Sequence, residues 1–172
     1  LSFIFDNPIR YLVQNPYKIL RPYIRQSWTV LDIGPGPGYF TIPLARIVGE
    51  TGKVIAADIQ PYMLRSVRRK AVKAGLQSRI TLIECQPDNT CVDEPVDFCL
   101  AFWMVHEVPD RQRLIGEIYA ILKSGGLLMI AEPKLHVSRQ SFAASVDVAK
   151  NLGMTVIAEP GVFISNTAVL KK

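Results

Sequence analysis

The sequence predicts an α/β protein with a mostly parallel sheet, helices on both faces of the sheet and an antiparallel last strand. Two observations lead to this fold class. Short β-branched runs alternate with helical patterns through most of the chain, and the chain ends in two strand-like runs with no helix between them. Strands that alternate with helices favour a parallel sheet joined by right-handed crossovers.

The elements follow in order along the chain. We expect an N-terminal helical arm over residues 1–27 that packs on a single domain over residues 28–172, and Pro16 and Pro22 should break the arm into short helices. Five strands are expected before the chain's end: Thr29–Ile33, Lys53–Ala57, Ile80–Ile83, Val96–Phe102 and Gly126–Ala131. Helices are expected at Tyr39–Val48, Pro61–Ala74, Asp110–Leu122 and Ser138–Leu152.

Two connections depart from this alternation. The segment Glu84–Pro95 is polar and contains two prolines, so any helix in it is short. Near the end, Met154–Ile157 and Val162–Leu170 are separated only by Glu159-Pro160-Gly161, which leaves no room for a crossover helix. Strands joined this closely pair antiparallel, and this predicts the reversed last strand.

Composition limits the class of protein. The chain has 172 residues, of which 49% are hydrophobic and 20% charged, as in an ordinary globular protein. No apolar run approaches the ~18 residues of a membrane span, and the first residues lack the pattern of a secretory signal. The cysteines are odd in number and bunched, and their spacing fits no zinc site, so we expect a reducing cytoplasm and no metal: Cys85, Cys91 and Cys99.

The net charge of +5 raises the question of nucleic-acid binding. Much of this charge lies in the helix expected at Pro61–Ala74, where Arg65, Arg68 and Arg69 have the spacing of one helix face. A solvated, solubilising surface is the favoured interpretation, and a nucleic-acid partner stays open.

The motif with the most chemical content is VLDIGPGPGYF over residues 30–40. An apolar strand ends in Asp32 and is followed by a loop of alternating glycines and prolines: Gly34, Pro35, Gly36, Pro37 and Gly38. Glycine allows tight turns and leaves no side chain between the backbone and a ligand. In open α/β sheets, ligands bind at the carboxyl ends of the strands, where this loop lies.

The spacing of the glycines distinguishes two kinds of cofactor. A dinucleotide loop, G-x-G-x-x-G, requires glycine at Tyr39 or at Thr41, depending on where it starts, and neither is glycine. Twenty residues after Gly38, the strand VIAAD ends in Asp58, which is well placed to accept hydrogen bonds from ribose hydroxyls. That acid alone would suit NAD equally well.

Together these motifs resemble the class I S-adenosylmethionine-dependent methyltransferases, from about Asn7 to the end of the chain. VLDIGPGPG looks like the first motif of that class and VIAAD like its second. Asp97, in VDFCLAF, is similar to its fourth motif, and LKSGGLLMI over residues 122–130 resembles its late motif. The overall sequence pattern is most similar to that of the small-molecule branch, which includes enzymes that methylate quinones. The resemblance implies a Rossmann-like sheet of seven strands with the last one reversed.

The resemblance also implies roles for particular residues. Asp32 and the Gly34–Gly38 loop would hold the methionine portion of S-adenosylmethionine, Asp58 the ribose, and the adjacent Ile59 would also contact the donor. Class members usually carry Gly-Asp-Ala after the third strand, where this chain has Cys85-Gln86-Pro87. A glutamine carbonyl can still accept from the adenine amine, so Gln86 takes that role. Phe102 would lie where the donor meets the acceptor.

Methyl transfer depends mainly on alignment of the nucleophile, the methyl group and the sulfur, which can supply ~7–11 kcal/mol. A base is needed only if the acceptor arrives protonated. His106 follows the fourth expected strand and is the candidate base, with capping or orientation of the next helix as an equally weighted alternative. Glu132, at the end of the fifth strand, is more readily explained by a structural hydrogen bond than by contact with the acceptor.

Three functions therefore stay open. The favoured one is an enzyme that methylates a small molecule. The second is an RNA or protein methyltransferase, although Ala101-Phe102-Trp103-Met104 lacks the Pro-Pro-aromatic signature of enzymes that methylate base amines. The third is a non-catalytic module that binds a nucleotide or the methyl donor.

Overall fold

The computed structural model describes residues 13–172, so the first part of the expected arm lies outside the described residues. The chain divides into two compact units, one that ends at Val92 and one over Asp93–Lys172. Each unit carries its own part of the candidate chemistry.

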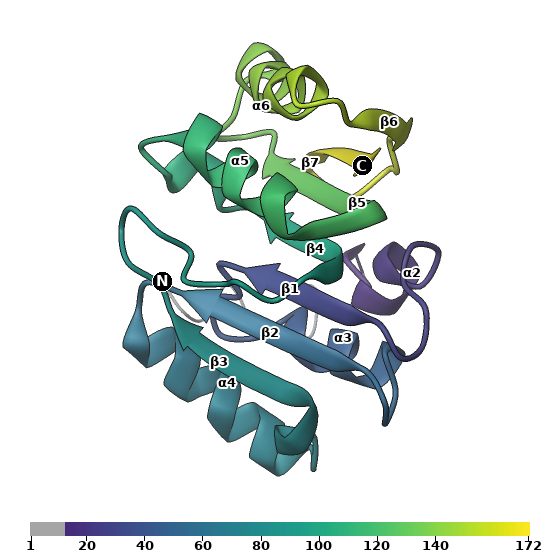
Figure 1. Ribbon diagram of the computed structural model, residues 1–172, viewed down its shortest axis with the longest axis vertical. Coiled ribbons are helices and arrows are strands. Elements are labelled where there is room, and N and C mark those ends of the chain that lie inside the picture. Colours follow the sequence, from purple (N-terminus) through teal and green to yellow (C-terminus); the bar gives the residue numbers. More distant parts are fainter. Residues whose placement is uncertain (1–12) are drawn as a thin grey trace. The chain divides into compact units, whose positions relative to one another are not determined.

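The first unit holds three parallel strands with helices between them (Figure 1). Its elements are α2 (Pro16–Leu20), β1 (Thr29–Ile33), α3 (Thr41–Ile47), β2 (Lys53–Asp58), α4 (Pro61–Lys73), the short 3₁₀ turn η2 (Gln77–Arg79) and β3 (Ile80–Glu84). In the register of β1 and β2, Asp32 lies opposite Ala56, so the loop after β1 and Asp58 share the carboxyl end of this sheet. The arm helix α2 packs on α3, and its Leu20 is fully buried.

The second unit contains the antiparallel part of the sheet. Its elements are β4 (Val96–Phe102), the 3₁₀ turn η3 (Val105–Glu107), α5 (Arg111–Ile121), β5 (Leu122–Pro133), α6 (Arg139–Asn151), β6 (Thr155–Ala158) and β7 (Ser165–Lys171). Strands β4 and β5 are parallel, whereas β7 runs antiparallel to both β5 and β6. The reversed strand that the short connection predicts is therefore present.

The predicted fold class is confirmed: seven strands follow the order β3-β2-β1-β4-β5-β7-β6. Burial along the strands agrees with this order. Strands β1, β2 and β4 are buried almost without interruption, as expected for strands covered on both faces, whereas the two outermost strands, β3 and β6, alternate between exposed and half-buried positions. Across residues 13–172, none of the helices has the length and apolar character needed to cross a membrane.

Some element boundaries differ from those predicted. Helix α3 begins at Thr41 instead of Tyr39, because Gly38-Tyr39-Phe40 is still part of the turn that closes the glycine loop. Strand β7 begins at Ser165 instead of Val162, because Ile164 adopts a left-handed backbone with φ +51° that no strand accommodates. The segment after β3 forms a tight turn, in which the backbones of Gln86 and Asn89 pair with each other around Pro87 and Asp88.

Candidate functional site

The glycine loop of the first unit requires glycine for two different reasons. Gly34, Gly36 and Gly38 all have positive φ, at +66°, +53° and +88°. A Cβ on Gly38 would lie 3.2 Å from Val67 Cγ2 of α4, so this glycine permits close packing of the loop on the helix. A Cβ on Gly36 would meet no atom within 4 Å, so the backbone there is open to a ligand. The geometry at Gly36 fits the predicted role of the loop.

Asp32, at the end of β1, is a buried acid. Its exposed fraction is 2%, and its Oδ2 accepts a hydrogen bond of 2.6 Å from the hydroxyl of Thr41 at the start of α3. Burial raises the pKa of Asp32 to about 7, the Thr41 hydroxyl opposes that rise, and the negative charge of Asp58 adds to it. A carboxylate of this kind is poorly solvated and is ready to interact with a cation. Sequence reasoning did not identify Thr41 as its partner.

Asp58, at the end of β2, lies one strand away. Its exposed fraction is 8%, and its Oδ1 accepts from the backbone N–H of Gln60 at 2.9 Å, which fixes the turn into α4. The next side chain, Ile59, is 55% exposed and offers an apolar surface. A carboxylate beside an exposed aliphatic side chain can hold a polar sugar and an apolar base next to each other.

The third strand contributes the turn that carries Gln86. The N–H of Cys85 donates to the carbonyl of Asp58, which ties the end of β3 to the end of β2. The buried Cys85 thiol donates to the carbonyl of Thr90 at 3.2 Å, and the side chain of Gln86 is exposed. The structure therefore places Gln86 at the same edge as Asp32 and Asp58, in a turn held by backbone hydrogen bonds.

Tyr39 ties the arm to this loop. Its hydroxyl donates to the carbonyl of the buried Gln14 at 2.8 Å, and its ring packs edge-on against Phe40. Tyr17, another aromatic residue of the arm, accepts from Arg46 Nη1 of α3 at 3.0 Å. The described part of the arm therefore contacts both the residue that follows the glycine loop and helix α3.

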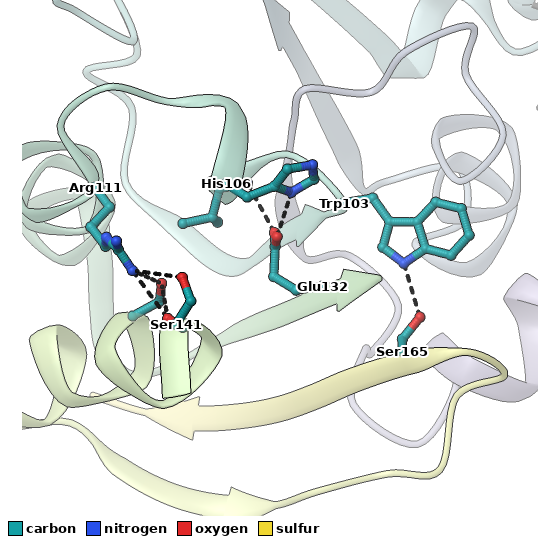
Figure 2. A network of polar contacts seen from close by, with 8 residues as sticks. Trp103, His106, Arg111, Glu132, Ser141 and Ser165 are labelled. Atoms are coloured by element: carbon teal, nitrogen blue, oxygen red, sulfur yellow. Dashed lines mark hydrogen bonds and ion pairs between the residues drawn. The ribbon is translucent and has the colours of Figure 1, made fainter. Parts of the chain in front are cut away.

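The second unit has its own polar cluster, at the ends of β4 and β5 (Figure 2). Phe102 ends β4 and lies against Trp103, with 5.4 Å between the ring centroids. Trp103 has φ +58°, a strained conformation for a bulky side chain. Its backbone N–H donates to Ala131 at 2.7 Å, and its indole Nε1 donates to Ser165 Oγ at 2.9 Å. Strands β5 and β7 thus hold Trp103, three residues before His106.

His106 lies in η3 and contacts Glu132 of β5. The Nδ1 of His106 is 2.5 Å from Glu132 Oε2, and the N–H of Val105 donates to Glu132 Oε1 at 3.0 Å. The side chain of His106 is 27% exposed and that of Glu132 only 2%. Burial raises the pKa of the Glu132 carboxyl above its usual range, and the nearby His106 and the backbone N–H groups oppose that rise.

This arrangement excludes capping of the next helix as the role of His106. The next helix, α5, is capped by Asp110, whose side chain accepts from the N–H of Arg113 at 2.9 Å. His106 is therefore not the helix cap. Glu132 does make the structural hydrogen bond expected of it, to Val105, and it binds the candidate base with its other oxygen.

The comparisons with known proteins agree with this geometry. The family model described as a methyltransferase domain matches residues 30–126, more than half of the chain. The chain belongs to this family. The sequence-based recognition of a class I S-adenosylmethionine-dependent methyltransferase is confirmed, and S-adenosylmethionine is the methyl donor on which this class depends.

Among its curated relatives, the methyltransferase domain is 34% identical over 115 residues to the ubiquinone/menaquinone biosynthesis C-methyltransferase UbiE of Escherichia coli. The match covers 63% of this chain and 44% of the relative. The chain thus spans less than half the length of the curated relatives that it matches.

Solved structures share the fold of the methyltransferase domain. An S-adenosylmethionine-dependent methyltransferase from Aquifex aeolicus has a TM-score of 0.81 at 24% identity, with 96% of this chain and 93% of that chain covered. A protein described as a putative rRNA methylase from Clostridium thermocellum has a TM-score of 0.73 at 19% identity and covers 92% of this chain and 93% of its own. These likenesses establish the fold.

Proposed function

We propose that this methyltransferase domain transfers the methyl group of S-adenosylmethionine to a small-molecule acceptor by in-line displacement. When bound, S-adenosylmethionine supplies an electrophilic methyl group on a positively charged sulfur. The proposal rests above all on Gly36, whose backbone borders open space at the sheet edge that carries Asp32 and Asp58. Two carboxylates beside an open backbone favour a ligand that is cationic and has ribose hydroxyls.

Each proposed donor contact has a chemical reason. Asp32 receives the ammonium group of the methionine portion, and Gly34, Pro35, Gly36 and Gly38 shape the loop that encloses it. Asp58 accepts from the ribose hydroxyls, and Ile59 offers its exposed side chain to the adenine. Gln86 accepts from the adenine amine. Phe102 stays a prediction from the resemblance.

The same loop disfavours a dinucleotide. A pyrophosphate needs several backbone N–H donors at close range, but Pro35 and Pro37 have none, and the N–H of Gly38 donates to the carbonyl of Pro35 at 3.0 Å. The charge of Asp32 and Asp58 would also repel a pyrophosphate. Binding of NAD or NADP is therefore not expected.

A small-molecule acceptor is supported by the name of the curated relative, a C-methyltransferase of ubiquinone and menaquinone biosynthesis. Such an acceptor has a proton to lose, for which His106 is the proposed general base. Helix α4 buries one side, formed by Leu64, Val67 and Ala71, and carries its basic residues elsewhere, as in any amphipathic surface helix. Its positive charge therefore does not by itself indicate a nucleic-acid acceptor. RNA and protein acceptors are the alternatives that a labelling experiment distinguishes.

Isothermal titration with S-adenosylmethionine, S-adenosylhomocysteine, NAD and NADP tests the donor. Micromolar affinity for the first two and no detectable heat from the last two are expected. Comparable heat from NAD would overturn the proposal, and no binding of any of the four would favour a non-catalytic domain. A metabolite extract, total RNA and a protein extract, each incubated with the enzyme and methyl-labelled donor, then show which class of acceptor takes the label.

A reducing compartment such as the cytoplasm is part of the proposal. It is supported by the cysteines, which are odd in number and bunched in the sequence, and by the burial of Cys85 and Cys99. The division of the chain into an arm over residues 1–27 and a domain over residues 28–172 likewise stays a prediction.

A further inference from the structure

The carboxylate of Glu132 has both oxygens engaged by donors. Oε1 accepts from the backbone N–H of Val105, which can only donate, and Oε2 faces Nδ1 of His106. Because only 1% of the whole Glu132 residue is exposed, water does not compete for these oxygens. In its ionised state Glu132 accepts and cannot donate, so in that state Nδ1 of His106 carries the hydrogen of this contact.

The position of this hydrogen determines the tautomer of the neutral His106 ring. A neutral imidazole has a single N–H. When that N–H is at Nδ1, Nε2 has a free lone pair. Figure 2 shows the second ring nitrogen of His106 directed away from Glu132, and 27% of the His106 side chain is exposed. The accessible edge of the ring is therefore the edge able to accept a proton.

The surrounding residues hold this pair in place. Glu132 pairs with Asn166 of β7 in a continuous antiparallel ladder. The strained Trp103 is held through both its backbone and its indole N–H. Strain of this kind persists only where the surroundings over-determine the conformation, and it concentrates at functional sites.

Neighbouring charged groups do not take the place of Glu132. The guanidinium of Arg111, in the next helix, donates to the carbonyl and hydroxyl of Ser141 and to the hydroxyl of Ser145 (Figure 2). Asp110 accepts from the N–H of Arg113, and Glu107, on the same turn as His106, is exposed. Among the described residues, Glu132 is the carboxylate that contacts the His106 ring.

We propose that Glu132 is a positioning residue that holds His106 with Nε2 as the base, and that the pair serves acceptors whose nucleophilic atom carries a weakly acidic proton, an O–H or an activated C–H. This inference rests on the proposed methyl transfer. The acceptor's proton passes to Nε2 while the electron pair released forms the new bond to the methyl carbon. The carbon–sulfur bond breaks toward sulfur, which leaves as a neutral thioether, and Glu132 balances the charge of the imidazolium. Acceptors with a free lone pair, such as a thioether or a tertiary amine, would not need this pair.

Nitrogen-15 NMR of the histidine rings tests the inference without an acceptor. The chain has only two histidines, so His136 serves as an internal reference. In the wild type at a pH where His106 is neutral, the expected signals are those of a ring protonated at Nδ1. In Glu132→Gln, the amide oxygen can satisfy only one of its former donors, and the amide NH₂ then faces Nδ1. The expected result is a shift of the equilibrium toward the Nε2–H tautomer.

Glu107→Gln is the matched control, because it makes the same chemical change at an exposed position one residue from His106. It should leave the tautomer unchanged. A wild-type ring protonated at Nε2, or an Nδ1–H ring that persists in Glu132→Gln, would overturn the inference. If Glu132→Gln does not fold, the wild-type spectrum decides by itself. Titration of both variants with S-adenosylhomocysteine tests the proposed donor binding separately, since neither substitution alters the glycine loop.

Discussion

Asp32→Asn should make the protein more stable at neutral and alkaline pH while weakening its binding of the donor. The carboxyl has a pKa of about 7 in the folded protein against 3.8 for an unperturbed aspartate, mainly because it is buried. Below pH 3.8 both the folded and the unfolded chains hold the proton, and the group contributes nothing. As the pH rises to about 7, the unfolded chain releases this proton first, so the folded state becomes less stable relative to the unfolded state.

The size of the effect follows from the difference between the two pKa values. A gap of about three pH units corresponds to roughly 4 kcal/mol at about 1.4 kcal/mol per unit, as an upper limit. Between pH 5 and pH 8, the wild type should therefore lose about 2–3 kcal/mol of unfolding free energy that Asp32→Asn keeps. Asparagine can still accept the hydrogen bond from Thr41, so that contact is preserved.

Urea unfolding of both proteins, followed by circular dichroism at pH 5, 6, 7 and 8, measures this difference. Asp93→Asn removes an exposed carboxylate and is the control for the change in net charge. Stability curves for wild type and Asp32→Asn that run parallel from pH 5 to pH 8 would refute the argument that burial of Asp32 is costly.

The same carboxylate should couple donor binding to pH. Only the ionised form attracts the ammonium group, so the affinity of the wild type for S-adenosylhomocysteine should rise between pH 6 and pH 8, with release of a proton. Asp32→Asn should bind it more weakly by about 1.5–3 kcal/mol, the worth of a hydrogen bond to a charged group, with no such pH dependence. Calorimetry in two buffers of different ionisation enthalpy measures the released proton directly. An unchanged affinity would exclude Asp32 from the donor site.

Three further predictions concern other parts of the structure. Gly36→Ala should abolish binding of S-adenosylhomocysteine, measured by calorimetry. Gly75 also has a positive φ (+69° against +53° at Gly36) and open space around an added Cβ, so Gly75→Ala should carry only the backbone strain of about 1–2 kcal/mol. Equal losses of affinity in the two variants would refute the role of the loop. Asp58→Ala should weaken the same ligand by about 1.5–3 kcal/mol, and an equal wild-type affinity for its 2′,3′-dideoxy analogue would show that Asp58 does not hold the ribose. Ser165→Ala should lower the unfolding free energy by about 1 kcal/mol. In a Trp103→Phe background the same substitution should cost less. If denaturant titrations show that the free-energy losses of the two substitutions simply add, the coupling of the two side chains is contradicted.

The fold was predictable because its strands have unambiguous patterns. The bounds of β1 and β4 agree residue for residue with the expected Thr29–Ile33 and Val96–Phe102. Both are buried along almost their whole length, so mostly apolar runs, each interrupted by one aspartate, mark them. Edges and turns were less predictable. The residues Val162–Ile164 look like a strand, but the left-handed Ile164 removes them from it.

The conformation of the glycine loop was predictable and the contact between His106 and Glu132 was not. Positive φ at alternating glycines is a local property, and the sequence of residues 34–38 is enough to predict it. The contact between His106 and Glu132 joins residues that are 26 positions apart, on different elements. From the sequence, each had a structural explanation that was at least as good as a catalytic one.

What the sequence determined by itself is the set of local rules: alternating strands and helices, a loop that only glycines can form, acids at strand ends and a reversed last strand. Tertiary structure alone decided that β7 lies between β5 and β6, that burial raises the pKa of Asp32, and that Glu132 reaches His106. The physical reason is that backbone conformation depends on neighbours in sequence, whereas desolvation and side-chain pairing depend on neighbours in space, which the chain acquires only when it folds.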